Sequence, residues 1–107
     1  MIRRLLVLPK ARNDLDEAAL WYDEQRSGLG QEFLAEATSV IATVATSPGI
    51  HHCVRRNPEI RRALTKRFPF RIYFVVEPDA VVVFRVLHTS RHDREWKRAI
   101  PGQQHGR

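Results

Sequence analysis

The sequence predicts an α+β fold: an N-terminal strand, an antiparallel helical hairpin, a three-stranded antiparallel meander and a short C-terminal helix. Apolar residues recur at helical spacing over residues 15–44 and alternate with a period of two over residues 70–87. Clusters of Gly, Pro, Ser and Asp separate these segments. The 107 residues suit a single domain. We expect the domain to span residues 1–100, with a disordered tail over residues 101–107.

The first predicted element is a short strand over residues 2–8. Its apolar side chains are interrupted by Pro9, which cannot donate a backbone hydrogen bond to a sheet. The segment is basic and then apolar, but its apolar run ends after Leu8. Because that run is short for the core of a signal peptide or for a membrane span, we expect neither.

Two helices follow. Apolar residues at helical spacing over 15–22 predict the first, and Asp14 is expected in its early turns, where a carboxylate suits the positive end of the helix dipole. Gly28 and Gly30 end this helix, and a second helix fits residues 31–46. The short connection predicts an antiparallel hairpin.

The remaining chain has the period of a sheet. Residues 53–56 and 60–64 could each form a strand, or one of them could be irregular. Residues 70–76 alternate clearly, a turn containing Pro78 follows, and residues 80–87 form the return strand. Ser90 and Asp93 have the spacing of a capping box, which predicts a short helix that ends near Arg98.

The helical hairpin needs an apolar sheet face on which to pack. We expect that face to carry the side chains of Phe70, Ile72, Phe74, Val82, Phe84 and Val86. Because successive strand residues point to opposite faces, Arg71, Tyr73 and Arg85 are then expected side by side on the other face. Trp21 and Tyr22 are interpreted as core or groove residues of the helix pair.

Positive charge is concentrated in the middle of the chain. The formal net charge is +6, and residues 54–75 alone carry seven basic and one acidic side chain. Such density favours an anionic partner over a merely solvated surface. The residues expected to bind that partner are Arg61, Arg62, Arg67, Arg71, Arg85 and Arg91.

The chemistry-bearing residues predict neither a metal nor a cofactor. Cys53 is the single cysteine, which fits a reducing cytoplasm and excludes a disulfide framework. His51, His52 and Cys53 lack the spacing of a zinc site and have no second ligand pair. The sequence also contains no glycine-rich phosphate loop.

Three segments resemble the RelE/ParE superfamily of bacterial toxins from type II toxin–antitoxin modules. D-L-D-E-A-A-L-W-Y-D-E-Q-R-S-G-L-G-Q-E-F-L is similar to the helical hairpin of that family. R-R-A-L-T-K-R-F-P-F-R-I-Y-F and V-V-V-F-R-V-L-H-T-S-R-H-D-R-E-W are similar to its later strands and C-terminal signature. The W-Y-D-E-Q-R-S-G-L-G and H-x-x-R-H-D-x-x-W patterns resemble the ParE-like, plasmid-stabilisation branch most.

The resemblance implies two alternative activities and one constant partner, a cognate antitoxin with an acidic segment. ParE-like members poison DNA gyrase and inhibit growth, which is the activity we expect. RelE-like members act on the ribosome and cut mRNA without a metal; that activity would make Arg71, Arg91 and His88 catalytic. Trp96 stands where such an RNase would have a tyrosine, and an indole is only a hydrogen-bond donor. A plain nucleic-acid-binding domain fits less well, because the basic segment lacks interleaved aromatics suited to stacking on bases.

Overall fold

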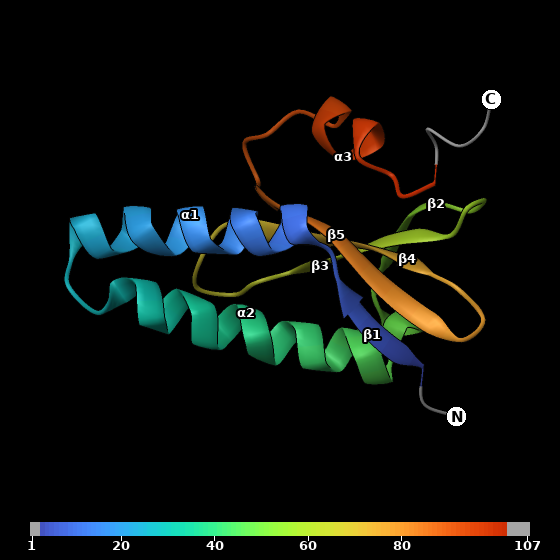
Figure 1. The fold of residues 1–107 in the computed structure, drawn as a ribbon, viewed down its shortest axis with the longest axis horizontal. Coiled ribbons are helices and arrows are strands. Elements are labelled where there is room, and N and C mark those ends of the chain that lie inside the picture. The colour runs from blue at the N-terminus through green and yellow to red at the C-terminus, as the bar shows by residue number, and fades with distance from the viewer. Residues whose placement is uncertain (1–2, 103–107) are drawn as a thin grey trace.

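A computed structural model describes residues 3–102. It has a five-stranded sheet with the order β1-β5-β4-β3-β2 (Figure 1). A helical hairpin of α1 and α2 packs on one face of the sheet and α3 on the other. The elements are β1 (Arg4–Val7), α1 (Pro9–Gln25), α2 (Leu29–Thr46), the 3₁₀ turn η1 (Pro48–Ile50), β2 (His52–Arg55), β3 (Ile60–Leu64), β4 (Phe70–Val76), β5 (Ala80–His88) and α3 (Arg94–Arg98). In the described residues, no helix combines the length and the apolar character that crossing a bilayer requires.

Helix α1 begins directly after β1. Pro9 occupies its first turn, where the missing N–H is tolerated and the fixed φ favours a helix. The helix therefore starts earlier than the apolar spacing indicated. Asp14 consequently lies beyond the first turn, so the predicted contact with the helix dipole is wrong.

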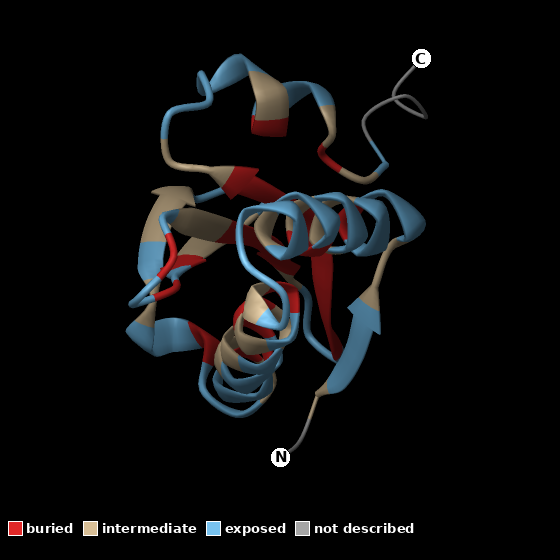
Figure 2. Cartoon of the chain, turned by 90° about the vertical axis from the view of Figure 1, so that its left-hand side faces the viewer, coloured by how far each residue is buried: buried red, intermediate tan, exposed pale blue. Residues whose placement is uncertain are grey.

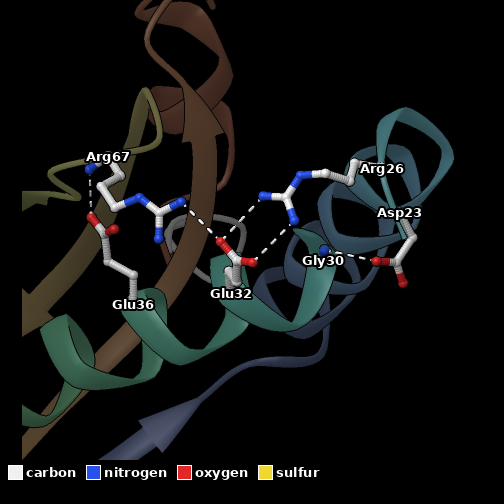
Figure 3. Close-up of polar contacts among 6 residues, drawn as sticks. All are labelled: Asp23, Arg26, Gly30, Glu32, Glu36 and Arg67. Atoms are coloured by element: carbon white, nitrogen blue, oxygen red, sulfur yellow. Dashed lines mark hydrogen bonds and ion pairs between the residues drawn. The ribbon is translucent and has the colours of Figure 1, made fainter. Parts of the chain in front are cut away.

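The two glycines between the helices have different structural roles. Gly28 has a φ of 90°, in the left-handed region, and ends the hairpin turn. Gly30 lies where the helices touch: a Cβ atom there would stand 2.3 Å from the carbonyl oxygen of Ala19. Its N–H donates a hydrogen bond of 2.8 Å to the carboxylate of Asp23 (Figure 3). The predicted antiparallel hairpin is thus closed by a tight helix crossing.

The sheet contains one more meander strand than the three expected, because residues 52–55 and residues 60–64 are both strands. Strands β2 to β5 pair antiparallel in sequence order, and β1 pairs parallel with β5. The predicted turn joins β4 to β5, closed by a hydrogen bond of 2.8 Å from the N–H of Glu77 to the oxygen of Ala80.

A bulge in β5 divides its side chains differently from a simple alternation. The pairing moves from Tyr73↔Arg85 directly to Phe74↔Val83, which leaves Phe84 as an extra residue on β5. As a result, Val82 and Phe84 face α3, while Val83 and Val86 face the hairpin. The expectation that Val82 and Phe84 pack against the hairpin was therefore wrong.

Both faces of the sheet are covered by apolar cores, so the buried segments lie between the sheet and the helices on either side (Figure 2). The hairpin-side core includes Ala11, Ile41, Val44, Ala63, Ile72, Phe74, Val81, Val83 and Val86. The α3-side core includes Ile60, Tyr73, Val75, Ala80, Val82, Phe84, Leu87, Trp96 and Ile100. Residues 101–102 form a turn, and the rest of the predicted tail, residues 103–107, lies outside the described residues.

Candidate functional site

Arg85 belongs to the interior of the molecule. Its side chain is 9% exposed and donates to the carboxylate of Asp14 through Nε at 2.7 Å and Nη2 at 3.1 Å. The same carboxylate accepts the backbone N–H of Val86 at 2.9 Å, where β5 extends beyond its pairing with β1. The prediction that Arg85 binds an external anion is wrong, because Asp14 already neutralises its charge in a fork-like geometry.

Arg91 and Arg85 both reach the same carboxylate on α3. Glu95 lies 3.7 Å from Nη1 of Arg85 and 3.4 Å from Nη1 of Arg91. The Arg91 side chain is exposed, so this second pair is weak and leaves the guanidinium accessible. Arg91 therefore remains a candidate for an external contact.

Arg61 and Arg67 also make internal contacts. Arg61 pairs with Glu59 at 2.7 Å and donates to the carbonyl oxygen of His51 at 2.7 Å, so it stabilises the start of β2. Arg67 pairs at 2.9 Å with Glu32, a residue of α2 that also pairs with Arg26 (Figure 3). These hydrogen bonds, from Arg67 first and Arg26 second, lower the pKa of Glu32. Arg67 thus contacts the hairpin, but its side chain is 61% exposed, so this ion pair is weak and the guanidinium stays accessible, as for Arg91.

The three candidate catalytic residues do not meet. Phe70 pairs with His88 and Arg71 pairs with Leu87 across β4 and β5. Phe70 packs on the hairpin side, whereas Leu87 belongs to the α3-side core. Because directly opposite residues share a face and successive residues alternate, His88 and Arg71 point to opposite faces of the sheet. His88 and Arg91 do line one hollow, together with the acidic residues Asp14 and Glu17.

His88 has a structural role at the end of β5. Its Nδ1 accepts the backbone N–H of Ser90 at 3.0 Å and lies 2.8 Å from the Ser90 hydroxyl, and its ring packs edge-on against Phe70. Ser90 is therefore used at the end of β5. The predicted capping box does not form, since Asp93 at the start of α3 makes no side-chain cap.

Trp96 joins α3 to the sheet. Its ring is 4% exposed and stacks on Tyr73, with centroids 5.6 Å apart and planes 17° apart. The cationic ends of Arg55 and Lys97 each lie 5.8 Å from the centroid of the Trp96 ring. Trp96 is thus a buried anchor and holds two cations close to the surface above it.

The cations that remain open gather beside this anchor, in what we term the β2–α3 groove. The groove is lined by His52, Cys53, Val54, Arg62, Asp93, Trp96 and Lys97. Arg62 stands on β3 on the α3-side face, opposite His52 on β2. Of the predicted anion-binding set, Arg62 therefore lies in an open cationic hollow. Arg55 and Lys97 are not in the predicted anion-binding set, although Arg55 belongs to the dense basic segment 54–75 and Lys97 follows Trp96 directly.

Arg71 has an unusual environment. In residues 3–102 its Nε atom is buried and has no hydrogen-bond partner. Its neighbour across β3 is Leu64, which is 58% exposed, so this end of the α3-side face is open. Arg71 is itself half-buried, so its Nε is a buried donor that the described residues leave unsatisfied.

The chain is similar to known proteins in sequence and in fold. A family model described as "ParE toxin of type II toxin-antitoxin system, parDE" matches residues 5–93. The chain belongs to the ParE toxin family. It also resembles a solved chain from the "Chromosomal ParDE TA system from P. aeruginosa", with a TM-score of 0.74 and 16% identity over 83% of this chain and 98% of that one. A search of curated proteins found no match. As a toxin of a type II module, the protein has a cognate antitoxin as its partner.

This ParE toxin carries a second open surface, which is apolar. Ala18, Trp21, Tyr22, Pro69, Phe70 and His88 line a groove beside the hairpin. Tyr22 packs in an aromatic cluster with Phe33, Phe68 and Phe70, as expected of a core residue, and burial raises its pKa. Trp21 is 56% exposed and forms a wall of the groove, which is one of the two environments predicted for it.

Proposed function

We propose that this ParE toxin acts by binding, with DNA gyrase as its target, and that it does not cut mRNA. The ParE-like sequence patterns favour this target. The observation that carries the proposal is the separation of His88 and Arg71 on opposite faces of the sheet.

Metal-free RNA cleavage needs a base, a cation and an acid around one phosphate. In this chain the histidine lies with Arg91 in a hollow that also contains two carboxylates, Asp14 and Glu17. Asp14 is neutralised by Arg85, but Glu17 would repel an incoming phosphate. Trp96 is buried against Tyr73 and has no proton to exchange usefully. These contacts favour a binding mechanism.

A RelE-like activity is the second candidate, and it depends on the shared hollow of His88 and Arg91. The two functions differ in what they require of His88. Loss of a general acid or base slows a reaction by roughly 10²–10⁴-fold. A toxin that acts by binding through another surface should tolerate the same loss.

The test compares His88→Ala with the unmodified toxin after induction in the absence of antitoxin. We expect both proteins to stop growth within about twofold of each other, since no proton transfer at His88 is needed. Purified toxin should also raise gyrase-dependent cleavage of supercoiled plasmid, while total mRNA stays intact in vivo. Growth inhibition lost in His88→Ala, together with codon-periodic mRNA cuts by the unmodified toxin, would overturn the proposal in favour of the endonuclease.

A further inference from the structure

Several cations near the β2–α3 groove have no internal counter-charge. Within residues 3–102, the ion pairs of the structure leave out Arg55, Arg56, Arg62 and Lys97. By contrast, Arg26, Arg61, Arg67, Arg85 and Arg91 all pair with carboxylates. The unpaired cations lie on β2, β3, α3 and the turn after β2. Tertiary structure therefore separates cations that have a carboxylate partner from cations whose charge no ion pair offsets.

The groove holds its cations in a defined geometry. Trp96 is clamped on Tyr73, and the cationic groups of Arg55 and Lys97 lie at equal distances of 5.8 Å from its ring centroid. A second hollow shares Cys53 with the groove and contains Arg56 beside the paired Arg61 and Glu59. The positive surface thus continues around the β2–β3 hairpin, and its position is set by a rigid sheet and a buried ring.

The charge of the molecule is also divided between its ends. Residues 1–53 carry seven acidic and five basic side chains, most of the acids on the hairpin, whereas residues 54–75 carry a net charge of +6. An extended polyanion would be attracted to the β2–β3 end and repelled by the hairpin. The partner would therefore approach in a preferred orientation.

We propose that the β2–α3 groove binds the phosphate backbone of double-stranded DNA, so that the toxin contacts the nucleic acid held by its target. This inference rests on the proposed function, because gyrase acts on DNA. Arg62 in the groove and Arg55, which lies over the Trp96 ring beside it, supply planar guanidinium groups that match phosphate oxygens, and Lys97 supplies a point charge. These contacts fix the toxin on the duplex without reading its sequence.

The lining of the groove favours phosphates over a peptide. The exposed lining side chains are His52, Asp93 and Lys97, while Arg62, Cys53 and Val54 are half-buried and Trp96 is buried. Stable peptide recognition uses apolar anchors in pockets, whereas DNA interfaces are polar and strongly positive. Because the exposed lining of this groove contains no Phe, Tyr or Trp side chain, extended stacking on single-stranded bases is not favoured either.

The decisive measurement is the salt dependence of binding between purified toxin and a fluorescent DNA duplex of mixed sequence. Each lost phosphate contact should reduce the slope of log K against log salt by about 0.9. We expect Arg62→Ala and Lys97→Ala each to weaken binding at least about fivefold and to lower this slope by about that amount. Asp93→Asn should tighten binding, since it removes the carboxylate that faces the incoming phosphate.

Arg4→Ala is the matched control. Arg4 is exposed and lies on β1, at the opposite edge of the sheet from β2, and its loss changes the net charge by the same amount. Circular dichroism of each variant verifies that the fold is kept. Equal losses in Arg4→Ala and Arg62→Ala would show that net charge alone drives binding and would overturn the groove assignment.

The remaining outcomes separate this inference from the proposed function. Polyglutamate is the alternative ligand. If Arg62→Ala and Lys97→Ala weaken the binding of polyglutamate but not of DNA, the groove is a site for an acidic protein segment and the DNA proposal fails. Gyrase-dependent plasmid cleavage is scored independently. If the groove variants lose DNA affinity but still poison gyrase, the groove binds DNA but this binding is not needed for toxicity. Loss of poisoning with unchanged DNA affinity would contradict the inference and spare the proposed target.

Discussion

Arg85 and Asp14 join β5 to α1 across 71 positions in the chain. Both side chains are 9% exposed, and the Asp14 carboxylate also accepts the Val86 N–H. Either partner alone would be a buried charge without compensation, which is far more costly than an exposed ion pair. A single carboxylate partner therefore decides whether an arginine on this sheet forms a buried ion pair or is left to bind an external anion.

Arg85→Ala should lower the free energy of unfolding by about 3–5 kcal/mol, because Asp14 would remain buried and unpaired. Urea denaturation followed by circular dichroism measures the change. Arg91→Ala is the control, since its exposed pair with Glu95 is worth less than about 1 kcal/mol. Similar losses in the two variants would contradict the internal role of Arg85.

His51 should make stability depend on pH. Its ring packs edge-on against Phe74, its Nε2 has no hydrogen-bond partner within residues 3–102, and burial, followed by the charge of Arg61, lowers its pKa. The unfolded chain, with an ordinary histidine pKa of about 6.5, then binds a proton more readily than the folded chain. Stability should consequently fall as the pH drops below about 6.5 and level off below the folded-state pKa.

The measurement is urea denaturation at a series of pH values for His51→Gln and for the unmodified chain. Gln removes the titrating group, so the loss of stability below neutral pH should be smaller. His52→Gln, at the exposed neighbouring position, is the control and should retain the full loss. Superimposable pH profiles for the unmodified chain and His51→Gln would refute the role of His51.

At the scale of elements, the hairpin depends on the close crossing at Gly30. Gly30 is the second residue of α2, where helix propensity alone would favour Ala over Gly. Here, however, an added Cβ would meet the Ala19 carbonyl oxygen at 2.3 Å and the Asp23 carboxylate at 2.9 Å. The backbone oxygen has little freedom to move, so the helices would have to separate.

Gly30→Ala should therefore destabilise the domain by about 1–3 kcal/mol, the usual cost of overpacking. Gly49→Ala is the control: a Cβ there meets nothing within 4 Å, so its effect should be within about 0.5 kcal/mol. Thermal and urea unfolding of both variants give the comparison. A neutral or stabilising Gly30→Ala would mean that the helices can move apart at no cost.

The bulge in β5 is the other feature of this kind, and it changed the predicted packing of the two sheet faces. Strict alternation places Val82, Phe84 and Val86 on one face, but the extra residue at Phe84 sends Val82 and Phe84 to the other. A bulge leaves no distinct signal in a run of valines. The strand pairing of β4 with β5 and the packing of the side chains therefore decided at which residue of β5 the alternation between the two faces shifts.

At the scale of the whole molecule, the sheet has two covered faces. Trp96 seals the α3 side, so most of the surface expected to be a cationic front is a second core. The open positive surface has moved to its margin, at the β2–α3 groove. The acidic residues of the hairpin and the basic residues of segment 54–75 belong to different parts of the sequence, so charge is distributed unevenly along the chain. This arrangement favours recognition by one end of the toxin.

Short-range sequence patterns were sufficient to predict much of the fold of this protein. Helical spacing, the glycine break, the period-two strands and the turn containing Pro78 are all short-range features, and the structure confirms the α+β architecture that they predict. The family resemblance also depended on contiguous segments, and the family match confirms it. The dense basic segment also made Arg62 one of the candidate cations, and Arg62 lines the β2–α3 groove.

Only the tertiary structure decided which arginines are free. Arg61, Arg67 and Arg85 have the same side chain as Arg62, yet their carboxylate partners lie two, 35 and 71 positions away, at Glu59, Glu32 and Asp14. The energy of a charge depends on what surrounds it in space, and those neighbours come from α1, α2 and the turn before β3. Composition and periodicity determined how many cations the sheet would carry and in which strands, while packing determined how many of them still face solvent.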